Sequence, residues 1–390
     1  MPCEVSGHFS ARGSNGESVV TAGTGGDKRV LLLSAYDAVS HRRWREGLVA
    51  AFPDVEWTVL TLPPRHFRWR IRGNSLTWAF AERAALEAGH DRIIATSMVD
   101  LAGLRGLVPA LAATPALAYF HENQFAYPES GHAHPSHDHR MVNLYTALAA
   151  DEVRFNSAFN RDTFRAGARA LLARMPDAVP TALDGTLAGL GSVLPVPLDP
   201  AWFRADAAPT GGPLTLVWPH RWEHDKAPER FVAALERLVA RGVDFRVHLL
   251  GQQFRDSPVD VAALAERLGS RAGEVGPVAD DDAFRAVLQS SHVVVSTALH
   301  DFQGLAVQEA VAAGCRPLVP DRLAYRDFIP AEWRYPDHGD EAGAEAVALA
   351  DRLEALAADQ NRGELPPPPD LGWLAWPQQR PAWAQALGFD

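Results

Sequence analysis

Two regions of this chain alternate short apolar runs with longer helical stretches, and this alternation limits the possible folds more than any other feature. Such alternation is typical of a parallel sheet covered by helices. Helices are expected near 41–52 and 75–88 and from Pro228 onward. Strands are expected at 30–34, 56–61, 92–96, 116–120 and 153–155, and again at 214–218, 245–250, 274–275, 292–296 and 316–319. The sequence therefore predicts an α/β chain of two Rossmann-like domains that face each other across a cleft.

A connection rich in proline and glycine separates the two regions. It covers 195–200 and 207–213, and such stretches are where domain boundaries are expected. We expect a first domain over 29–205 and a second over 206–365. Residues 1–28, rich in Gly, Ser and Thr, are expected to form a flexible tail. Residues 366–390 begin with four prolines and contain Trp373, Trp376 and Trp383, so we expect them to pack back on the first domain.

Charge and cysteine content narrow the class of protein. The chain has 390 residues and a net charge of −11, which argues against broad, non-specific nucleic-acid binding but leaves a local basic groove possible. Its two cysteines, Cys3 and Cys315, provide neither a disulfide framework nor a cysteine-based zinc site. No run approaches the ~18–20 apolar residues of a membrane span. We expect a cytoplasmic protein that does not insert into a membrane, and the oligomeric state stays open.

The strand expected at 214–218 runs directly into a charged loop. In 217–226, Val-Trp-Pro-His-Arg-Trp-Glu-His-Asp-Lys, the cations Arg221 and Lys226 lie between this strand and the helix that starts at Pro228. Ligands of open α/β sheets bind at such carboxyl ends, and helix N-termini favour anions. A guanidinium with an ammonium suits a diphosphate. The alternative is a pair of solvated loop cations.

A second junction of the same kind follows the strand expected at 292–296. Gly304 and Leu305 begin the next helix, where a glycine lets backbone N–H groups approach a ligand. Asp301 and Glu309 lie eight residues apart across this helix start, and both can accept hydrogen bonds from sugar hydroxyls. The alternative is that Asp301 only caps the helix and that Glu309 is an ordinary solvated residue.

Together, these junctions and three further strings resemble the retaining GT-B glycosyltransferases, and most closely the tRNA-queuosine mannosyltransferase group. The strings, in order, are Leu-Pro-Pro-Arg-His-Phe-Arg-Trp-Arg at 62–70, Tyr-Phe-His-Glu-Asn-Gln at 119–124, Phe-Asn-Ser-Ala-Phe-Asn at 155–160 and Trp-Pro-His-Arg-Trp-Glu-His-Asp-Lys at 218–226. The resemblance spans roughly 29–335. It departs from the family where Asp301 replaces a glutamate and where 35–41 lacks the usual glycines.

The resemblance implies a GT-B fold and transfer of a hexose, with retention, onto the queuosine of a tRNA anticodon. The implied donor is a nucleotide sugar, GDP-mannose, with no metal or other cofactor. Arg221 and Lys226 would neutralise the leaving diphosphate and Glu309 would bind the ribose. Asp301, with the backbone of Gly304 and Leu305, would hold the donor sugar.

The resemblance also places a catalytic histidine, His121, beside the transferred sugar. It follows the strand expected at 116–120, although a lone histidine there is more often structural. The implied acceptor-side residues are Ser40, His41, Glu122, Asn123, Gln124 and Asn156. Asn156 and Ser157 are also candidate caps of the following helix.

A basic stretch without acids lies between 57 and 81. Cations that alternate with aromatic rings are suited to loop or single-stranded RNA, and the resemblance to a tRNA-modifying group favours that interpretation over a solvated surface loop. The expected RNA-contacting residues are Arg65, Phe67, Arg68, Trp69, Arg70 and Arg72.

The histidines in 131–139, Gly-His-Ala-His-Pro-Ser-His-Asp-His, could ligate a metal. Their spacing matches no known structural site, so we expect no metal there. Two other functions stay open for the chain: a GT-B transferase with a lipid or small-molecule acceptor, and a sugar- or nucleotide-binding protein without turnover.

Overall fold

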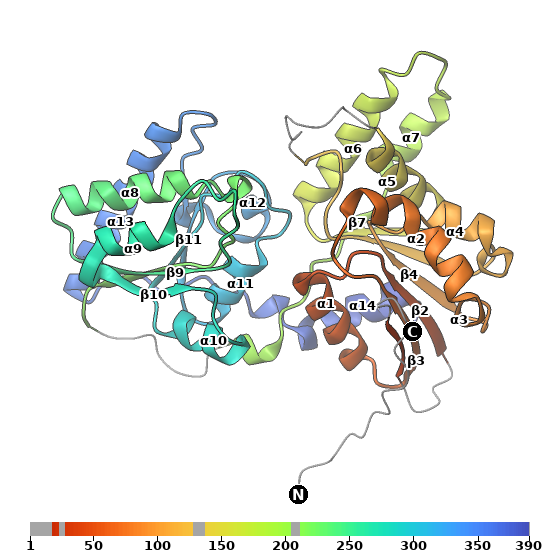
Figure 1. The fold of residues 1–390 in the computed structure, drawn as a ribbon, viewed down its shortest axis with the longest axis horizontal. Coiled ribbons are helices and arrows are strands. Elements are labelled where there is room, and N and C mark those ends of the chain that lie inside the picture. The colour runs from red at the N-terminus through yellow and green to blue at the C-terminus, as the bar shows by residue number, and fades with distance from the viewer. Residues whose placement is uncertain (1–17, 23–27, 128–136, 204–210, 390) are drawn as a thin grey trace, which may run out of the picture. The chain divides into compact units, whose positions relative to one another are not determined.

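The computed structural model describes residues 18–22, 28–127, 137–203 and 211–389. The chain divides into two compact units, Met1–Pro197 with Gln379–Asp390, and Leu198–Gln378. The first division falls inside the proline-rich connection, slightly before the boundary predicted at residue 205. Each unit contains its own sheet flanked by helices (Figure 1). The prediction of two Rossmann-like α/β units is confirmed.

The sheet of the first unit has seven strands in the order β1-β3-β2-β4-β5-β6-β7. β1 pairs antiparallel with β3, and the other pairs are parallel. The central strands are almost entirely buried because helices cover both faces. The strands are β1 (Ser18–Ala22), β2 (Lys28–Ser34), β3 (Val55–Thr61), β4 (Arg92–Thr96), β5 (Ala116–Phe120), β6 (Glu152–Phe155) and β7 (Ser192–Val193).

β1 corrects the expectation of a flexible tail over 1–28. Residues 18–22 add an antiparallel edge strand to the sheet, and Lys28 already belongs to β2. The reason is the run Ser-Val-Val-Thr-Ala, whose β-branched residues favour a strand. The remainder of the expected tail lies outside the described residues.

Helices of the first unit form two layers on its sheet. Those that contribute to the core on the Phe120 side are α2 (Phe67–Ala81), α4 (Leu101–Leu107), α5 (Asp138–Ala149) and α6 (Ala158–Leu172). α1 (Val39–Ala51) lies against the other face, where Trp44 stacks on Tyr119 at 5.0 Å between ring centroids. The short elements are α3 (Arg83–Leu86), η1 (Pro109–Leu111) and α7 (Thr181–Gly189).

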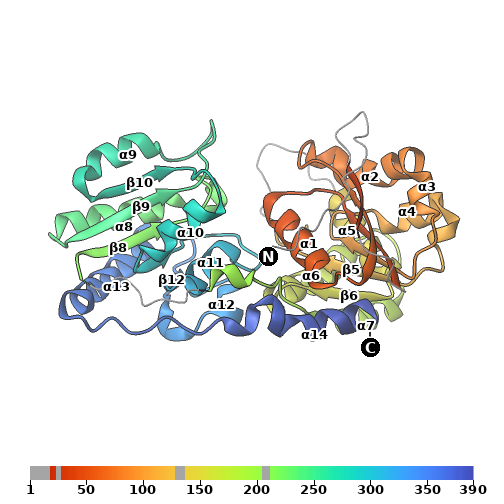
Figure 2. The same cartoon turned by 90° about the horizontal axis from the view of Figure 1, so that it is seen from below.

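The C-terminal helix α14 (Trp376–Leu387) packs beside α1, as Figure 2 shows. Trp383 is fully buried, with its ring centroid 4.8 Å from that of Tyr119 and 5.7 Å from that of Trp44. Arg92 donates a hydrogen bond of 2.8 Å to the Ala386 carbonyl. The prediction that the C-terminal segment crosses back to the first domain is confirmed from Gln379 onward, whereas residues 366–378 of the predicted segment belong to the second unit.

The second unit has a parallel six-stranded sheet in the order β10-β9-β8-β11-β12-β13. The central strand β8 is fully buried, and its Trp218 stacks on Phe231 of α8 (Pro228–Ala240) at 4.6 Å between ring centroids. Its strands are β8 (Leu214–Trp218), β9 (Phe245–Leu250), β10 (Ala272–Gly276), β11 (Val293–Val295), β12 (Arg316–Pro320) and β13 (Arg334–Tyr335).

The helices of the second unit follow the predicted alternation. The longest, α13 (Ala342–Arg362), packs on α8 (Pro228–Ala240). The others are α9 (Val261–Leu268), α10 (Asp281–Gln289), α11 (Leu305–Ala312) and α12 (Tyr325–Phe328), with short turns η2 (Pro200–Trp202), η3 (His224–Lys226), η4 (Gly269–Arg271), η5 (Ala331–Trp333) and η6 (Gly372–Leu374). Among the described residues, no helix is long and apolar enough to cross a bilayer.

The main error in the helix predictions concerns α2. The helix was expected near 75–88, but it begins at Phe67, ends at Ala81 and is followed by the separate short helix α3. His66 adopts a left-handed conformation immediately before it, with φ of 53°. The basic stretch therefore forms the first turns of a helix rather than a loop.

Candidate functional site

The loops after β8 and β11 are joined into one structure in the second unit. Thr297 Oγ1 donates to the carbonyl oxygens of Lys226 and Ala227, at 2.8 and 2.9 Å. The backbone N–H groups of Leu299 and His300 both donate to the Asp225 carbonyl. The two loops that the sequence marked independently are therefore held side by side at the carboxyl edge of the sheet, where ligands of such sheets bind.

Lys226 lies at the centre of this arrangement. Its ammonium donates to the His300 carbonyl at 2.7 Å. The same nitrogen lies 3.4 Å from Oδ2 of Asp225 and 3.4 Å from Oδ2 of Asp301. Its side chain is only 13% exposed, so water screens its charge less than that of a surface lysine. Lys226 therefore provides a fixed, largely desolvated positive charge.

Asp301 has two roles, one for each carboxylate oxygen. Oδ1 accepts hydrogen bonds from the backbone N–H groups of Gly304 and Gln303, at 2.7 and 3.3 Å, and so holds the turn before α11. Oδ2 lies 3.4 Å from Lys226 Nζ and accepts from the Tyr325 hydroxyl at 3.4 Å. Burial alone would raise the pKa of Asp301, but Lys226 and the backbone N–H groups hold it below its ordinary value. Asp301 is therefore ionised at neutral pH.

Gly304 lets the turn approach Tyr325 closely. Its φ is 78°, and a Cβ at this position would lie 2.7 Å from Cε1 of Tyr325. The tyrosine hydroxyl also bonds to Ser296 Oγ at 2.7 Å. Leu305 begins α11, and Glu309 is buried in that helix. The structure thus places Asp301, Gly304, Leu305 and Glu309 at one helix start.

Arg221 lies in the same loop as Lys226 but is exposed to solvent. Its guanidinium is 57% exposed and pairs with Glu223 at 2.5 Å. Among the described residues, no contact between Arg221 and Lys226 or Asp301 is present. The two cations therefore differ, because Lys226 is fixed and Arg221 can move away from Glu223 toward an anion.

His220 is a site residue to which the sequence analysis gave no role. It is buried between strand ends. Residue 251 packs against it and must be a glycine, because a Cβ there would come within 2.0 Å of the His220 carbonyl oxygen. Burial, together with the nearby Lys226, lowers the pKa of His220 to about 4. Its Nε2 atom has no hydrogen-bond partner among the described residues. His220 is therefore a neutral imidazole with a free polar atom beside Lys226.

In the first unit, His121 lies in a cluster of aromatic rings. Its centroid is 4.3 Å from that of His41, 4.5 Å from that of Trp44 and 4.7 Å from that of Tyr119. Burial and the neighbouring His41 lower the pKa of His121 well below its ordinary value. Neither ring nitrogen has a hydrogen-bond partner in the part of the chain that the structure describes. A neutral imidazole has one donor and one acceptor, so both are available to a ligand or water.

His41 differs from His121 because it is fully bonded. Nδ1 lies 2.7 Å from the Tyr36 carbonyl and Nε2 lies 3.1 Å from Glu122 Oε2. Burial alone would lower the pKa of His41, but the Glu122 charge and these hydrogen bonds raise it. Ser97 donates to the other oxygen of Glu122 at 3.1 Å. The predicted residues His41, His121 and Glu122 are thus brought together.

Among the remaining acceptor-side residues, the side chains of Asn123 and Asn156 form structural hydrogen bonds. Asn156 donates to the His121 carbonyl at 2.9 Å, and Asn123 donates to Asn160 at the start of α6. The Gln124 backbone donates to Asn143. Ser157, not Asn156, caps α6. Ser40 is exposed near the start of α1.

The residues expected to contact RNA divide by exposure. Arg65, Arg68, Trp69 and Arg72 are exposed, whereas Phe67 and Arg70 are half-buried. Phe67 packs between Tyr36 and His139, with centroid distances of 6.0 and 5.1 Å. Arg72 is weakly paired with Asp100, at 3.8 Å.

Most of the histidine-rich run at 131–139 lies outside the described residues. Of its members, His137, Asp138 and His139 are described, and His139 contacts Phe67. No group of three or more side chains arranged to hold a metal ion occurs in the described part of the chain.

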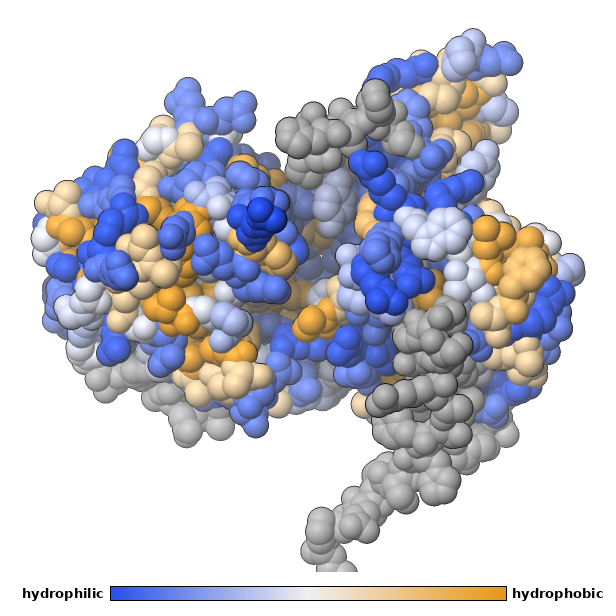
Figure 3. Space-filling model, in the orientation of Figure 1, coloured by the Kyte–Doolittle hydropathy of each residue, from blue (hydrophilic) through white to orange (hydrophobic). Residues whose placement is uncertain are grey.

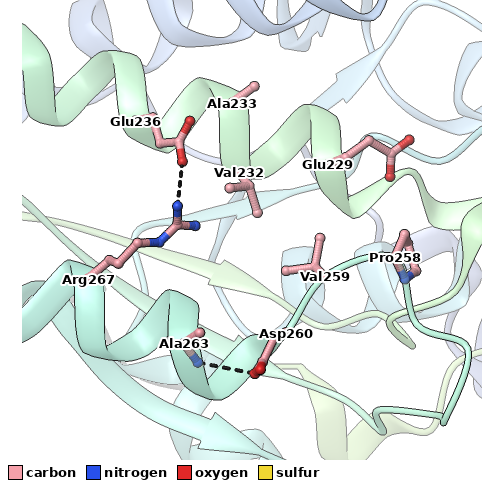
Figure 4. Close-up of a pocket in the computed structure, with 9 residues that line it drawn as sticks. All are labelled: Glu229, Val232, Ala233, Glu236, Pro258, Val259, Asp260, Ala263 and Arg267. Carbon is pink, nitrogen blue, oxygen red and sulfur yellow. Dashed lines mark hydrogen bonds and ion pairs between the residues drawn. The ribbon is translucent and has the colours of Figure 1, made fainter.

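A shallow pocket of about 290 Å³ lies between α8 and the start of α9 (Figure 4). Its rim contains Glu229, Glu236 and Asp260, and its cation Arg267 is already paired with Glu236 at 3.0 Å. None of the predicted site residues lines it. Its acidic rim disfavours a nucleotide diphosphate.

Comparison with known proteins decides the family. The family model described as tRNA-queuosine alpha-mannosyltransferase N-terminal matches residues 29–198. A Drosophila melanogaster tRNA-queuosine alpha-mannosyltransferase is 30% identical over 315 residues, which cover 78% of this chain and 83% of the relative. The chain belongs to the tRNA-queuosine alpha-mannosyltransferase family. It is therefore a member of a glycosyltransferase family, as its sequence resemblance indicated.

A more distant relative and two solved structures are also similar to this chain. A GDP-mannose:cellobiosyl-diphosphopolyprenol alpha-mannosyltransferase of Xanthomonas oryzae pv. oryzae (strain PXO99A) is 26% identical over 159 residues, 40% of this chain and 39% of the relative. A sucrose-phosphate synthase structure from Thermosynechococcus elongatus superposes with a TM-score of 0.62 at 17% identity, covering 92% of this chain and 96% of that one. An E. coli trehalose-6-phosphate structure bound with UDP-2-fluoro glucose superposes with a TM-score of 0.61 at 15% identity, covering 92% of this chain and 99% of that one. These neighbours confirm the GT-B fold.

Proposed function

We propose that the protein transfers mannose from GDP-mannose, with retention, to the cyclopentenediol of queuosine in a tRNA anticodon. The observation that carries the donor part is the Lys226–Asp301 pair, which joins the two loops at the carboxyl edge of the second sheet. Family membership supports the acceptor, since the Drosophila relative is a tRNA-queuosine alpha-mannosyltransferase. The proposed tRNA substrate also supports a cytoplasmic location for the protein.

The donor diphosphate is assigned to Lys226 and Arg221. A desolvated ammonium stabilises the negative charge that grows on a leaving diphosphate, because this charge interacts more strongly where water is excluded. Arg221 would exchange Glu223 for a phosphate, with which a guanidinium forms two parallel hydrogen bonds. These two cations serve as the counter-ions, so we propose that no divalent metal is required.

The donor sugar is assigned to Asp301 and the N–H groups at the start of α11, and the ribose to Glu309. Asp301 Oδ2 is ionised and points toward Lys226, so it is suited to accept a hydrogen bond from a sugar hydroxyl near the diphosphate. His121 is assigned a second sugar hydroxyl. Its neutral ring supplies one donor and one acceptor without adding a positive charge.

The proposed reaction replaces one bond to the anomeric carbon. The bond from this carbon to the diphosphate oxygen breaks, and a bond to the queuosine hydroxyl oxygen forms on the same face. The proton of that hydroxyl passes to the departing diphosphate oxygen. The residues of the chain bind and orient the reactants and stabilise the charge of the leaving group.

Incubation of the protein with GDP-mannose and tRNA that contains queuosine tests the proposal. Mass spectrometry of the digested nucleosides should show queuosine heavier by one hexose, and digestion by an α-specific mannosidase should remove that hexose. Matched controls are UDP-glucose as donor and tRNA from cells that lack queuosine. EDTA should leave the rate unchanged.

Each rival function predicts a different result. A transferase with a lipid or small-molecule acceptor would leave tRNA unmodified and consume GDP-mannose only when that acceptor is added. A binding protein without turnover would bind GDP-mannose in calorimetry and form no product with any acceptor. Loss of activity in EDTA would overturn the metal-free part alone.

A further inference from the structure

One face of α2 exposes aromatic and apolar side chains with arginines between them. Trp69 is 56%, Leu76 46% and Phe80 81% exposed, and Arg68 and Arg72 are also exposed. Positions 68, 69, 72, 76 and 80 follow at spacings that place them on one face of a helix. The opposite face, with Ile71 and Trp78, is buried in the core. Figure 3 shows hydrophobic side chains gathered over the end of α2.

Trp69 lies flat against this helix because residue 73 is a glycine. A Cβ at Gly73 would lie 2.5–2.8 Å from three atoms of the indole ring. One side of the ring therefore contacts the helix backbone while more than half of the side chain remains exposed. This geometry fixes an aromatic plane at the surface, whereas a freely rotating tryptophan would lose more entropy on binding.

The charge of this face differs from that of the whole chain. The protein has a net charge of −11, yet no acidic residue occurs between 57 and 81. Arg72 lies 3.8 Å from Asp100, with which it forms a weak ion pair. The face therefore attracts a polyanion, and the acidic remainder repels it from other orientations.

We propose that this face of α2 binds the unpaired loop of an RNA, with bases stacked on Trp69 and Phe80 and phosphates held by Arg68 and Arg72. The face runs roughly 18 Å from residue 68 to residue 80, at 1.5 Å per helical residue, which is long enough for several nucleotides. Exposed aromatic rings with interspersed cations are how proteins hold splayed bases. As an assignment to the tRNA anticodon loop, the inference rests on the proposed function, but RNA binding itself is measured without turnover.

The test measures binding of a synthetic RNA hairpin with a seven-nucleotide loop, by fluorescence anisotropy across a range of salt concentrations. Trp69→Ala and Phe80→Ala should each weaken binding by about fivefold or more, since a stacked base contributes ~1–3 kcal/mol. Arg68→Ala with Arg72→Ala should also weaken binding and reduce the slope of log affinity against log salt by about one per lost phosphate contact. A blunt duplex of equal length should bind the parent much more weakly than the hairpin.

Gly73→Ala tests the contribution of the fixed Trp69 ring to RNA binding without a change of charge. Alanine has a higher helix propensity than glycine, and the three nearest atoms that a Cβ at residue 73 would meet all belong to the Trp69 ring, so the variant should keep the fold of the parent. Its Cβ displaces the Trp69 ring, and hairpin binding should fall without any change of charge. Matched controls are Phe254→Ala, an aromatic that is 36% exposed in the other unit, and Arg169→Ala, a surface arginine paired with Asp184.

Hairpin affinity equal to that of the parent in the Trp69, Phe80 and paired arginine variants would overturn the inference, whether or not tRNA is mannosylated. Self-association lost in these variants, with hairpin binding unchanged, would identify the face as a contact between two copies and would also overturn it. A protein that binds the hairpin through α2 but forms no mannosyl-queuosine would contradict the proposed function alone.

Discussion

Arg322 donates hydrogen bonds to both carboxylate oxygens of Glu345, at 2.6 and 2.8 Å, in a fully buried part of the second unit. The same guanidinium donates to the carbonyls of Thr297 and Ala298, at 2.9 and 2.8 Å. Glu345 also accepts from Arg230 of α8 at 2.6 Å. The network therefore holds the loop that follows β11 in place and connects it to α8, the helix that follows Lys226.

Arg322→Lys should reduce turnover because it keeps the charge but loses the fork that holds Glu345 and two loop carbonyls. We expect kcat to fall tenfold or more, since a displacement of about 1 Å at a reacting centre costs up to about a hundredfold. Steady-state kinetics with GDP-mannose and tRNA measure this.

Arg326→Ala is the matched control, since Arg326 is an exposed arginine paired with Asp321. It should leave kcat unchanged. If Arg322→Lys lowers the unfolding temperature but not kcat, the network only stabilises the fold.

Acidification should charge His220 only near pH 4. With an ordinary value of 6.5 and a pKa of about 4 in the folded state, the unfolded chain gains a proton first as pH falls. The free energy of unfolding therefore has its full value above pH 6.5, where His220 is neutral in both states. It decreases as the pH falls from 6.5 to 4, by up to about 3 kcal/mol. Urea unfolding of the parent and of His220→Asn at several pH values measures this, and the variant should lose less stability on acidification.

A bound diphosphate should raise the pKa of His220, because its negative charge offsets that of Lys226. NMR titration of the His220 ring with and without GDP follows the midpoint directly. An unchanged midpoint in saturating GDP would place the diphosphate away from Lys226.

The sequence predicted the strands well because buried parallel strands are short, apolar runs next to helical stretches. The positions of Lys226 and Asp301 after strand ends were also predicted, since each follows such a run and lies before a helix, while their roles toward a donor stay predictions. These signals are local and depend on no residue far away in the chain.

The contacts that complete the site depend on residues far apart in the chain. Arg322 and Glu345 are 23 residues apart, and Arg230 and Glu345 are 115 apart, so no spacing rule relates them. His220 lies in the string at 218–226, but its low pKa depends on burial, which the string does not reveal. The α2 error had a similar cause, because charge along 65–72 was interpreted without the buried face formed by Ile71 and Trp78.

Trp383→Ala should destabilise the first unit strongly. Trp383 is fully buried against Trp44 and Tyr119, and truncation of a buried tryptophan costs about 3–5 kcal/mol. Trp373→Ala, at a site that is 45% exposed, should cost much less. Urea unfolding of the full chain compares them, and equal losses would mean that α14 is not a fixed part of the core.

Asp301→Asn should separate binding of the sugar from binding of the nucleotide. The asparagine oxygen can still accept from the Gly304 and Gln303 N–H groups, so the turn before α11 is kept, but the negative charge beside Lys226 is removed. GDP affinity, measured by calorimetry, should be equal or higher because Lys226 then lacks this competing anion. Turnover should fall about tenfold or more, since a hydrogen bond to a charged group contributes about 1.5–3 kcal/mol. Glu309→Ala should instead weaken GDP and reduce turnover together, and equal losses of GDP affinity in the two variants would contradict the separate roles proposed for these carboxylates.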